Sequence, residues 1–192
     1  MKRVEKMKSR LLAQSKKEYP AGQRLLAILA AGVLFLVVFP IVLARASRSL
    51  DRILQWPRIQ SARLAAILGG MMTVGGFLFA LWSIIVQFRL GRGTPIPAMA
   101  AQTLIVQAPY AYTRNPMALG TIVMYLGVAV LLGSFSAVLM VMGASVLLLS
   151  YIRIVEEREM VARFGDAYRV YRRQTPFLLP RLMNNSAGGG GR

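Results

Sequence analysis

Three long stretches of the chain hold no charged residue, and their lengths predict the architecture. Residues 25–44 and 64–88 form runs of 20 and 25 such residues, and a helix needs about 20 to cross a hydrocarbon core about 30 Å thick. The third run, 117–152, has 36 residues and would be roughly 54 Å long as one helix. We therefore predict that it folds back at Gly133-Ser134 into two helices, 117–132 and 135–152. The pattern predicts an all-α, polytopic membrane protein with four transmembrane helices, of which the third and fourth form a hairpin.

The connecting segments predict the orientation of this bundle. Segments 1–24, 89–116 and 153–192 would share one side and carry 19 Lys and Arg, whereas 45–63 and the turn carry five. Because positive loops stay in the cytoplasm, both termini are predicted to be cytoplasmic. A cleaved signal peptide is the competing interpretation of the first run, but that run is too long and its polar leader too extended.

The formal net charge of +17 has the same explanation. The basic excess is spread over short segments beside the membrane, where it faces anionic lipid, so we predict no nucleic-acid partner. Hydrophobic residues make up 56% of the chain, and it has no Cys and no His. Disulfide frameworks, thiol nucleophiles, Cys/His zinc sites and Ser-His-Asp triads are thereby excluded, and no metal site is predicted.

Local patterns refine the four helices. In segment 45–63, apolar residues predict a short amphipathic helix lying in the headgroups. Pro40 in the first helix requires a neighbour that satisfies the freed carbonyl. Small residues at close spacing along the second helix predict tight helix packing: Ala65, Gly69, Thr73, Gly76 and Ala80. We expect a basic arm over 1–24, a cytoplasmic helical cap over 153–183 and a disordered tail over 184–192.

Residues 89–120 carry the first cluster of informative polar groups. The glycines and prolines of 91–97 predict an irregular linker, and 102–107 a short extended piece. Pro116 suits the first turn of the third helix, where its missing N–H has no partner, and Asn115 is then the natural N-cap. An ordered helix start explains this pattern as well as a binding site does.

The second cluster, 153–181, follows the fourth helix. If that helix continues out of the membrane, Glu156 and Glu157 lie roughly 6–8 Å beyond Ile152. An i,i+4 surface pair between Arg153 and Glu157 is one explanation. Paired carboxylates that face an anionic lipid surface would also be explained by a cationic ligand group. Further on, aromatic residues and prolines predict an amphipathic cap or interfacial anchors: Tyr168, Tyr171, Pro176, Phe177 and Pro180.

Together the two clusters resemble the isoprenylcysteine carboxyl methyltransferase and phospholipid methyltransferase superfamily of integral membrane enzymes, over roughly residues 64–181. The matching stretches are GRGTPIP (91–97), QTLIVQAPYAYTRNPMALG (102–120) and EEREMVARFGDAYRVYRRQTPFLLP (156–180). The likeness lies in an ordered set: Tyr before Arg-Asn/His-Pro, a following Gly, an apolar hairpin, a Glu pair, Phe-Gly, spaced tyrosines and a closing Pro.

The resemblance implies methyl transfer from S-adenosylmethionine to a lipophilic acceptor, either a hydrophobic carboxylate of isoprenoid or other type or a phospholipid amine. It implies that Glu156 holds the donor's α-ammonium, while helix N-terminal N–H groups receive its carboxylate. Arg153 and Glu157 are the candidate catalytic residues, with Arg153 placed for an acceptor carboxylate or phosphate. The cofactor-binding residues it implies are Gln102, Thr103, Leu104, Ile105, Tyr110, Arg114, Asn115, Pro116, Met117, Ala118 and Glu156.

Three positions depart from the family's pattern: Asn115 stands in place of His, Ala118 in place of Tyr and Ala108 in place of Gly. Because Ala118 lacks the ring and hydroxyl of that Tyr, a second hypothesis stays open: a membrane protein of the same fold that has no catalytic activity. A nicotinamide-dependent reductase also stays open, since sterol reductases are similar around the Arg-Asn and Glu-pair segments, although they have more spans. In the absence of secretory and organelle signals, we expect a prokaryotic inner (plasma) membrane.

Overall fold

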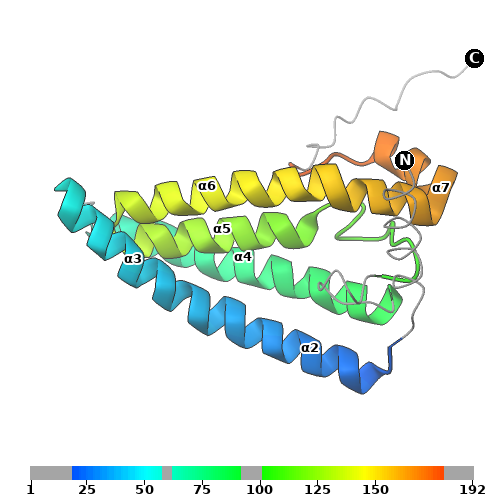
Figure 1. The fold of residues 1–192 in the computed structure, drawn as a ribbon, viewed down its shortest axis with the longest axis horizontal. Coiled ribbons are helices and arrows are strands. Elements are labelled where there is room, and N and C mark those ends of the chain that lie inside the picture. Colours follow the sequence, from blue (N-terminus) through cyan, green and yellow to red (C-terminus); the bar gives the residue numbers. More distant parts are fainter. Residues whose placement is uncertain (1–18, 58–61, 92–100, 180–192) are drawn as a thin grey trace, which may run out of the picture.

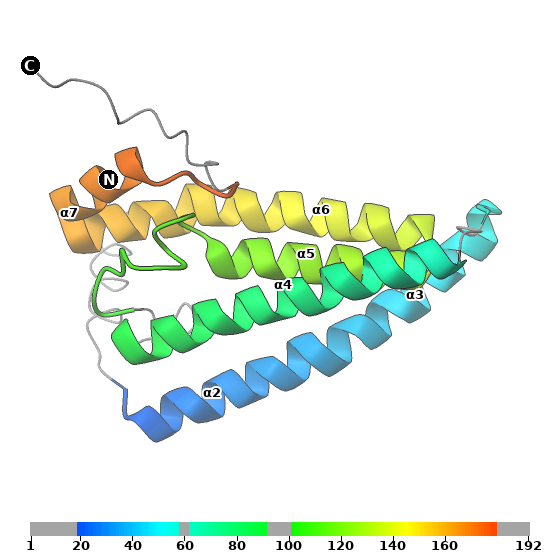
Figure 2. The same cartoon turned by 180° about the vertical axis from the view of Figure 1, so that it is seen from behind.

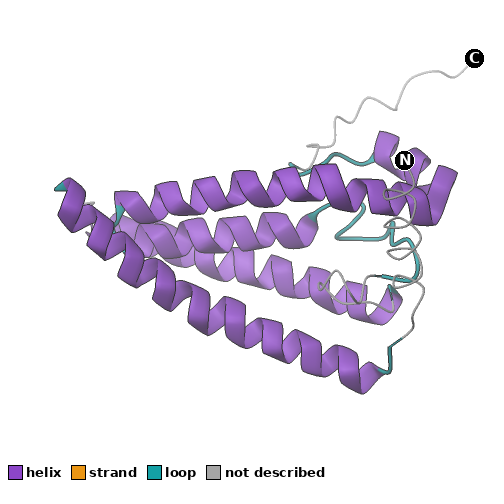
Figure 3. Ribbon diagram, in the orientation of Figure 1, coloured by secondary structure: helices purple, strands orange, loops and turns teal. Residues whose placement is uncertain are grey.

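The computed structural model describes residues 19–57, 62–91 and 101–179. Within these ranges every regular element is helical (Figure 3), as predicted. Most of the basic arm, most of the GRGTPIP stretch and the whole tail 184–192 lie outside the described residues, so the predictions made for them stay predictions.

Six α-helices make up the described fold: α2 (Ala21–Val33), α3 (Phe39–Leu54), α4 (Ala62–Leu90), α5 (Pro116–Leu131), α6 (Phe135–Tyr151) and α7 (Glu157–Gln174). The π-helical turns η1 (Leu34–Val38) and η3 (Ile152–Glu156) join α2 to α3 and α6 to α7. Three continuous helices are thus long and apolar enough to cross a membrane: Ala21–Leu54, Arg63–Leu90 and Phe135–Gln174. α5 is apolar but has only 16 residues, whereas a span takes about 20, so the fourth span stays a prediction.

The helices form a bundle with two distinct ends (Figures 1 and 2). α5 lies between α4 and α6, and α3 crosses them near the α5–α6 turn. α7 and the loop before α5 gather at the other end, which we call the cap end. Toward the cap end α2 diverges from α4, and no residue of α2 is buried.

The first helix runs further than the sequence indicated. The separate amphipathic helix expected within 45–63 is wrong, because α3 continues the first membrane helix without a break to Leu54. The helix continues through Pro40 because the turn before it is π-helical: Phe39 N–H donates to Leu34 O, five residues earlier. In that register Phe35 O is the carbonyl that Pro40 leaves free, and the Tyr125 hydroxyl donates to it. The prediction that a neighbour satisfies the proline is confirmed.

α4 and α5 pack through small residues, as predicted. A Cβ on Gly120 would lie 2.6 Å from the backbone nitrogen of Ala80, and one on Gly127 would lie 2.5 Å from that of Thr73. A Cβ on Gly76 would overlap the backbone of Met124. The two backbones therefore touch, which aligns the end of α4 with the start of α5.

The predicted hairpin turn is also confirmed. α5 ends at Leu131, Gly133 has a φ of +62° that favours glycine, and the Ser134 hydroxyl caps α6 by accepting from Ala137 N–H at 3.0 Å. A small core of Leu43, Ala129, Ala137 and Val141 lies at this end. The turn end is therefore closed by packing between α3, α5 and α6.

The candidate functional site at the cap end

The loop 101–115 is irregular, contains no strand and is fastened to the end of α4. Gln102 N–H donates to Gly91 O at 2.6 Å, and the Thr103 hydroxyl donates to Leu90 O at 2.6 Å. The Tyr110 hydroxyl approaches Ser83 O and Gln87 Oε1, at 3.4 Å each. Burial raises the pKa of Tyr110 far above its ordinary value, so its hydroxyl stays neutral.

The same loop is fastened on its other side to α7 and the segment after it. The Tyr171 hydroxyl donates to Tyr110 O at 2.7 Å, and Arg114 N–H donates to Pro176 O at 2.9 Å. Phe177 O accepts from the Asn115 side-chain amide at 2.8 Å and from the Thr113 hydroxyl at 3.3 Å. The loop is therefore clamped between α4 and the C-terminal cap.

Asn115 stands at the N-cap position of α5 and Pro116 in its first turn, as predicted. The Asn115 side chain makes no capping hydrogen bond, however, so the predicted N-cap role is wrong. Its amide is instead committed to Phe177 O. The first-turn N–H groups of Met117 and Ala118 have no acceptor within the helix, as at any helix N-terminus.

A buried ion pair joins the two clusters that the sequence singled out. Arg114 and Glu157 form a salt bridge, with side chains 10% and 9% exposed, and Arg172 approaches the second Glu157 oxygen at 3.9 Å. The i,i+4 pair between Arg153 and Glu157, one of the two explanations considered, is not formed, because Arg153 lies within the wide π-helical turn Ile152–Glu156 and Arg114 occupies the Glu157 carboxylate. Glu157 is thus neutralised within the protein.

Arg153 lies near Arg114 because both side chains contact the ring of Phe177. The Arg153 guanidinium lies 5.3 Å from the centroid of the Phe177 ring, and that of Arg114 lies 5.5 Å from the same ring. Phe177 therefore holds two predicted site cations near each other, on a segment that hydrogen-bonds the loop. Sequence reasoning treated this residue only as part of a cap or an anchor.

Glu156 differs from Glu157 in having no counter-charge. It is half-buried, and within the described ranges no salt bridge or hydrogen bond involves it. Burial, and then the negative charge of Glu159, raise the pKa of the Glu156 carboxyl. Such a carboxylate gains from a cationic partner.

The structure gathers the predicted residues unevenly. Tyr110, Arg114, Asn115, Glu157 and Arg153 meet through the contacts given above. The stretch 102–105 lies against the end of α4, and it is linked to α7 through Ala101 O, which accepts from Arg163. Within the described part of the chain, no hydrogen bond or salt bridge joins Leu104, Met117 or Ala118 to Glu156.

Sequence reasoning gave no site role to Thr113, Tyr168, Tyr171 or Arg172. Tyr168 and Tyr171 are buried on one face of α7, with ring centroids 6.0 Å apart. Burial and the Glu157 charge raise the pKa of Tyr168, and the positive charge of Arg114 partly opposes this rise. The i,i+3 spacing of the two tyrosines was the available signal for a shared face. A hollow of about 370 Å³ lies beside Tyr171, and none of the catalytic or cofactor-binding residues predicted from the sequence lines it. It is lined by Val106, Ala111, Ala167, Val170, Tyr171, Gln174 and Thr175.

This architecture defines a polytopic membrane protein whose polar chemistry is concentrated at one end of an apolar helical bundle. A family model for phospholipid methyltransferase matches residues 64–167, a little over half of the chain. The chain therefore belongs to the phospholipid methyltransferase family and is a methyltransferase-family membrane protein. The matched region includes nearly all of α4, the loop, α5, α6 and the Glu156-Glu157 pair.

Two curated proteins are similar over parts of their length. Protein-S-isoprenylcysteine O-methyltransferase of Schizosaccharomyces pombe is 34% identical over 79 residues, covering 41% of this chain and 34% of that protein. Methanethiol S-methyltransferase 2 of Bradyrhizobium diazoefficiens is 30% identical over 105 residues, covering 55% of this chain and 37% of that protein. The matched regions span about a third of these relatives. No solved structure gives a significant match.

Proposed function

We propose that this protein transfers a methyl group from S-adenosylmethionine to a lipophilic acceptor at the cytoplasmic membrane face. The observation that carries the proposal is Glu156, a half-buried carboxylate that has no counter-charge among the described residues and lies next to the neutralised Arg114–Glu157 pair. A carboxylate in this setting fits the α-ammonium of an amino-acid cofactor. Family membership supports methyl transfer as the reaction.

The residues of the cap end fit the rest of this cofactor. First-turn N–H groups of α5 would receive its carboxylate, as helix N-termini receive anions. Tyr110, held by Tyr171 and neutral, would lie against the adenine or near the sulfonium. The stretch 102–105 would complete the pocket. When bound, the cofactor would supply an activated methyl group: the acceptor atom would bond to the methyl carbon as the bond to the cofactor's sulfur breaks, S-adenosylhomocysteine would leave, and an amine or thiol acceptor would lose its proton to solvent.

The chain's own contribution is positioning and exclusion of water. An in-line displacement at a methyl group needs little acid–base help from the protein, which agrees with a chain that has no His and no Cys. Arg153, stacked on Phe177, would orient an acceptor carboxylate or phosphate. Glu157 would act as a positioning residue that fixes Arg114.

The acceptor would arrive sideways from the membrane between α2 and α4. α2 diverges from α4 toward the cap end and buries none of its residues (Figure 2). At that end Arg24 bridges the two helices, donating to Phe88 O at 3.2 Å with its guanidinium 4.6 Å from the Phe88 ring centroid. A hydrophobic chain could stay in lipid on this path while its reactive head reaches the loop.

The first test measures the thermal stability of the detergent-purified protein with S-adenosylmethionine, S-adenosylhomocysteine or NADPH. Binding at 100 times Kd should add about 2.7 kcal/mol. We expect a shift with both adenosyl compounds, lost in Glu156→Gln and kept in Asp166→Asn, which removes an exposed carboxylate of α7. The absence of any shift with the adenosyl compounds would contradict the proposal, and a shift with NADPH alone would indicate the reductase.

The second test identifies the acceptor by transfer of radiolabelled methyl groups. A prenylated cysteine analogue, phosphatidylethanolamine and methanethiol represent carboxylate, amine and thiol acceptors, the last because one relative is named for it. We expect product from a lipophilic acceptor. If the protein binds the cofactor but forms no product with any of these acceptors or with a wider set of hydrophobic acids, the result would favour the hypothesis that it keeps the fold without catalytic activity.

A further inference from the structure

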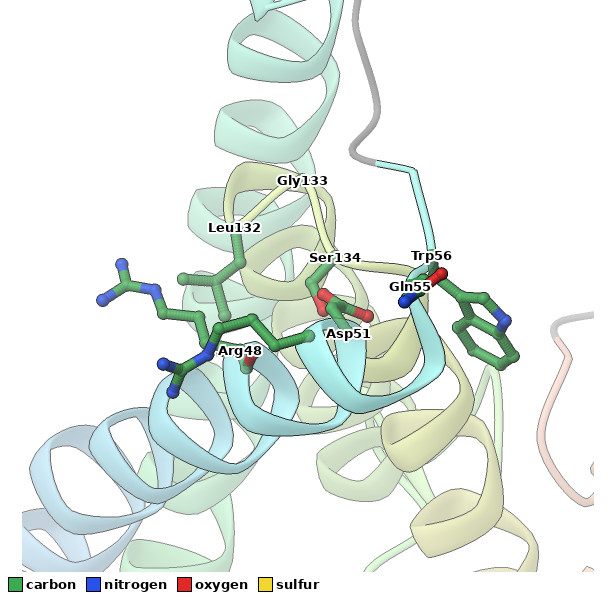
Figure 4. Close-up of a pocket in the computed structure, with 8 residues that line it drawn as sticks. Arg48, Asp51, Gln55, Trp56, Leu132, Gly133 and Ser134 are labelled. Carbon is green, nitrogen blue, oxygen red and sulfur yellow. Dashed lines mark hydrogen bonds between the residues drawn. The ribbon is translucent and has the colours of Figure 1, made fainter.

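A larger hollow lies at the opposite end of the bundle, where the end of α3 meets the α5–α6 turn (Figure 4). Its volume is about 500 Å³. It is lined by Arg48, Asp51, Arg52, Gln55, Trp56, Leu132, Gly133 and Ser134. None of these residues takes part in the cap-end site.

The hollow carries a net positive charge that the protein does not neutralise. Arg48 and Arg52 are one turn apart on α3 and exposed, and no salt bridge within the described ranges involves either. Arg52 Nε donates to Arg48 O at 3.3 Å. The carboxylate present, Asp51, is directed at α6, where it accepts from Ser136 N–H at 3.1 Å beside Ser134 (Figure 4). Both guanidinium groups are therefore available to an anion.

The position of the hollow along the first helix matches the headgroup layer. Asp51 accepts a hydrogen bond from Ser136 in the first turn of the apolar helix α6, so residues 48–55 of α3 lie level with the end of the α5–α6 hairpin. The headgroup layer begins at the edge of the hydrocarbon core and is about 5–7 Å deep on each side. Trp56, in the wall of the hollow, is of the residue type enriched at this depth.

Apolar groups at the same level indicate an amphiphile rather than a free ion. Leu132 forms part of the wall. Ile53 and Leu54, on the last turn of α3, are 75% and 48% exposed. Acyl chains of a lipid would cover such residues, whereas a dissolved anion would leave them unchanged.

We propose that this hollow binds the phosphate group of a phospholipid in the leaflet at the end of the bundle away from α7. Arg48 and Arg52 bind the phosphate oxygens through charge-assisted hydrogen bonds. Gln55 and Trp56 also line the hollow and offer amide and indole N–H donors to the glycerol and headgroup oxygens. The proposal does not depend on methyl transfer.

The test uses the full chain with Trp82→Phe, which leaves Trp56 as the single indole of a chain with two tryptophans. Dioctanoyl phosphatidylglycerol is titrated in nonionic detergent while Trp56 fluorescence is recorded. We expect Arg48→Gln/Arg52→Gln to raise Kd at least about tenfold. Arg45→Gln/Arg63→Gln removes the same charge from exposed positions outside the hollow and should leave Kd unchanged.

Three results would overturn the proposal: equal weakening in both double variants, equal binding of octanoate, or displacement of the lipid by inorganic phosphate at similar concentration. Equal weakening in both double variants would indicate general charge attraction. Equal binding of octanoate would show that the phosphate is not recognised. Displacement by inorganic phosphate would show that the ligand is a free anion. If the glutamine variant fails to fold, Arg48→Lys/Arg52→Lys keeps the charge without the planar fork. It should weaken binding to a smaller extent, and unchanged affinity in it would also contradict the proposal.

Discussion

At the scale of the residue, Glu156 is a group whose ionisation the folded protein opposes. Its folded-state pKa is raised by burial and by Glu159, so the folded state holds the proton more tightly than the unfolded chain does. The resulting loss of stability is absent below the unfolded pKa and fully present above the folded pKa. Above the folded-state pKa the free protein therefore carries an unfavourable charge at this position.

We predict that Glu156→Gln raises the ligand-free Tm at neutral pH by a few degrees and abolishes the cofactor-induced shift. The gain should shrink as pH falls toward the folded-state pKa, and wild-type cofactor affinity should weaken over the same interval as the carboxylate is protonated. Thermal scans between pH 5 and pH 8 (roughly the range of maximal stability), with and without S-adenosylmethionine, measure both effects. A variant less stable than wild type at neutral pH would contradict this account.

The Arg114–Glu157 pair should behave in the opposite way. Both side chains are about a tenth exposed, so removing one partner leaves an uncompensated charge, at a cost of about 3–5 kcal/mol. We predict this loss in the free energy of unfolding of Glu157→Gln, measured on the protein in detergent solution. The exposed Arg169–Asp166 pair is the control, and Asp166→Asn should cost less than about 1 kcal/mol. Equal effects would show that the buried pair contributes no more than a surface pair.

The sequence drew attention to residues that the structure brings together at the cap end, but it did not predict how they pair. The resemblance selected Arg114, Glu156 and Glu157 because their order along the chain is distinctive. The i,i+4 rule offered Arg153 as one possible partner of Glu157, since that rule assumes an unbroken α-helix. The partner chosen in the structure is 43 positions away and depends on how the loop closes over α7, which no local pattern specifies.

At the scale of the element, the α4–α5 contact depends on the missing side chain of Gly76. We predict that Gly76→Ala forces the backbones apart and destabilises the protein by about 1–3 kcal/mol. Gly75→Ala is its matched control, since a Cβ there meets nothing within 4 Å. That substitution should be neutral, or stabilising by up to about 1 kcal/mol through helix propensity. Denaturant unfolding compares the two, and similar values would rule out close backbone contact at Gly76.

The first helix offers a test of how a proline is accommodated within a membrane span. Tyr125→Phe removes the hydroxyl that donates to Phe35 O and should cost about 1 kcal/mol. In a Pro40→Ala background the restored N–H can serve the helix carbonyls, so the same change should cost much less. A double-mutant cycle measures this coupling. Additive effects would mean that the hydroxyl and the proline are independent.

Element positions followed from charge-free runs, and element ends did not. The fold-back at Gly133-Ser134 was fixed by length, since a run of 36 residues cannot cross once as a straight helix. The continuation of α3 to Leu54 was missed because Arg45 and Arg48 end the apolar run without ending the helix. Charged residues mark where a segment leaves the lipid. A helix ends where its backbone hydrogen bonding ends, as α3 does at Gln55, which has a left-handed φ of 52°.

At the scale of the whole molecule, the bundle separates two kinds of polar chemistry along its length. The cap end holds Glu156, the buried Arg114–Glu157 pair and neutral tyrosines, while the turn end holds the exposed Arg48 and Arg52 of α3. This separation has a functional meaning only if the two ends face opposite sides of the membrane. The distribution of Lys and Arg predicts that the cap end is cytoplasmic.

The absence of native Cys makes this orientation directly measurable. We predict that Ala162→Cys, exposed on α7, reacts with a membrane-impermeant maleimide only in inside-out vesicles of a bacterial host. Ser49→Cys, exposed on α3 outside the hollow, should react only in right-side-out vesicles. Labelling after detergent solubilisation shows that both thiols are reactive. Reaction of both cysteines from one side would place the two ends in the same compartment, and it would contradict both the predicted topology and a lipid site in the leaflet away from α7.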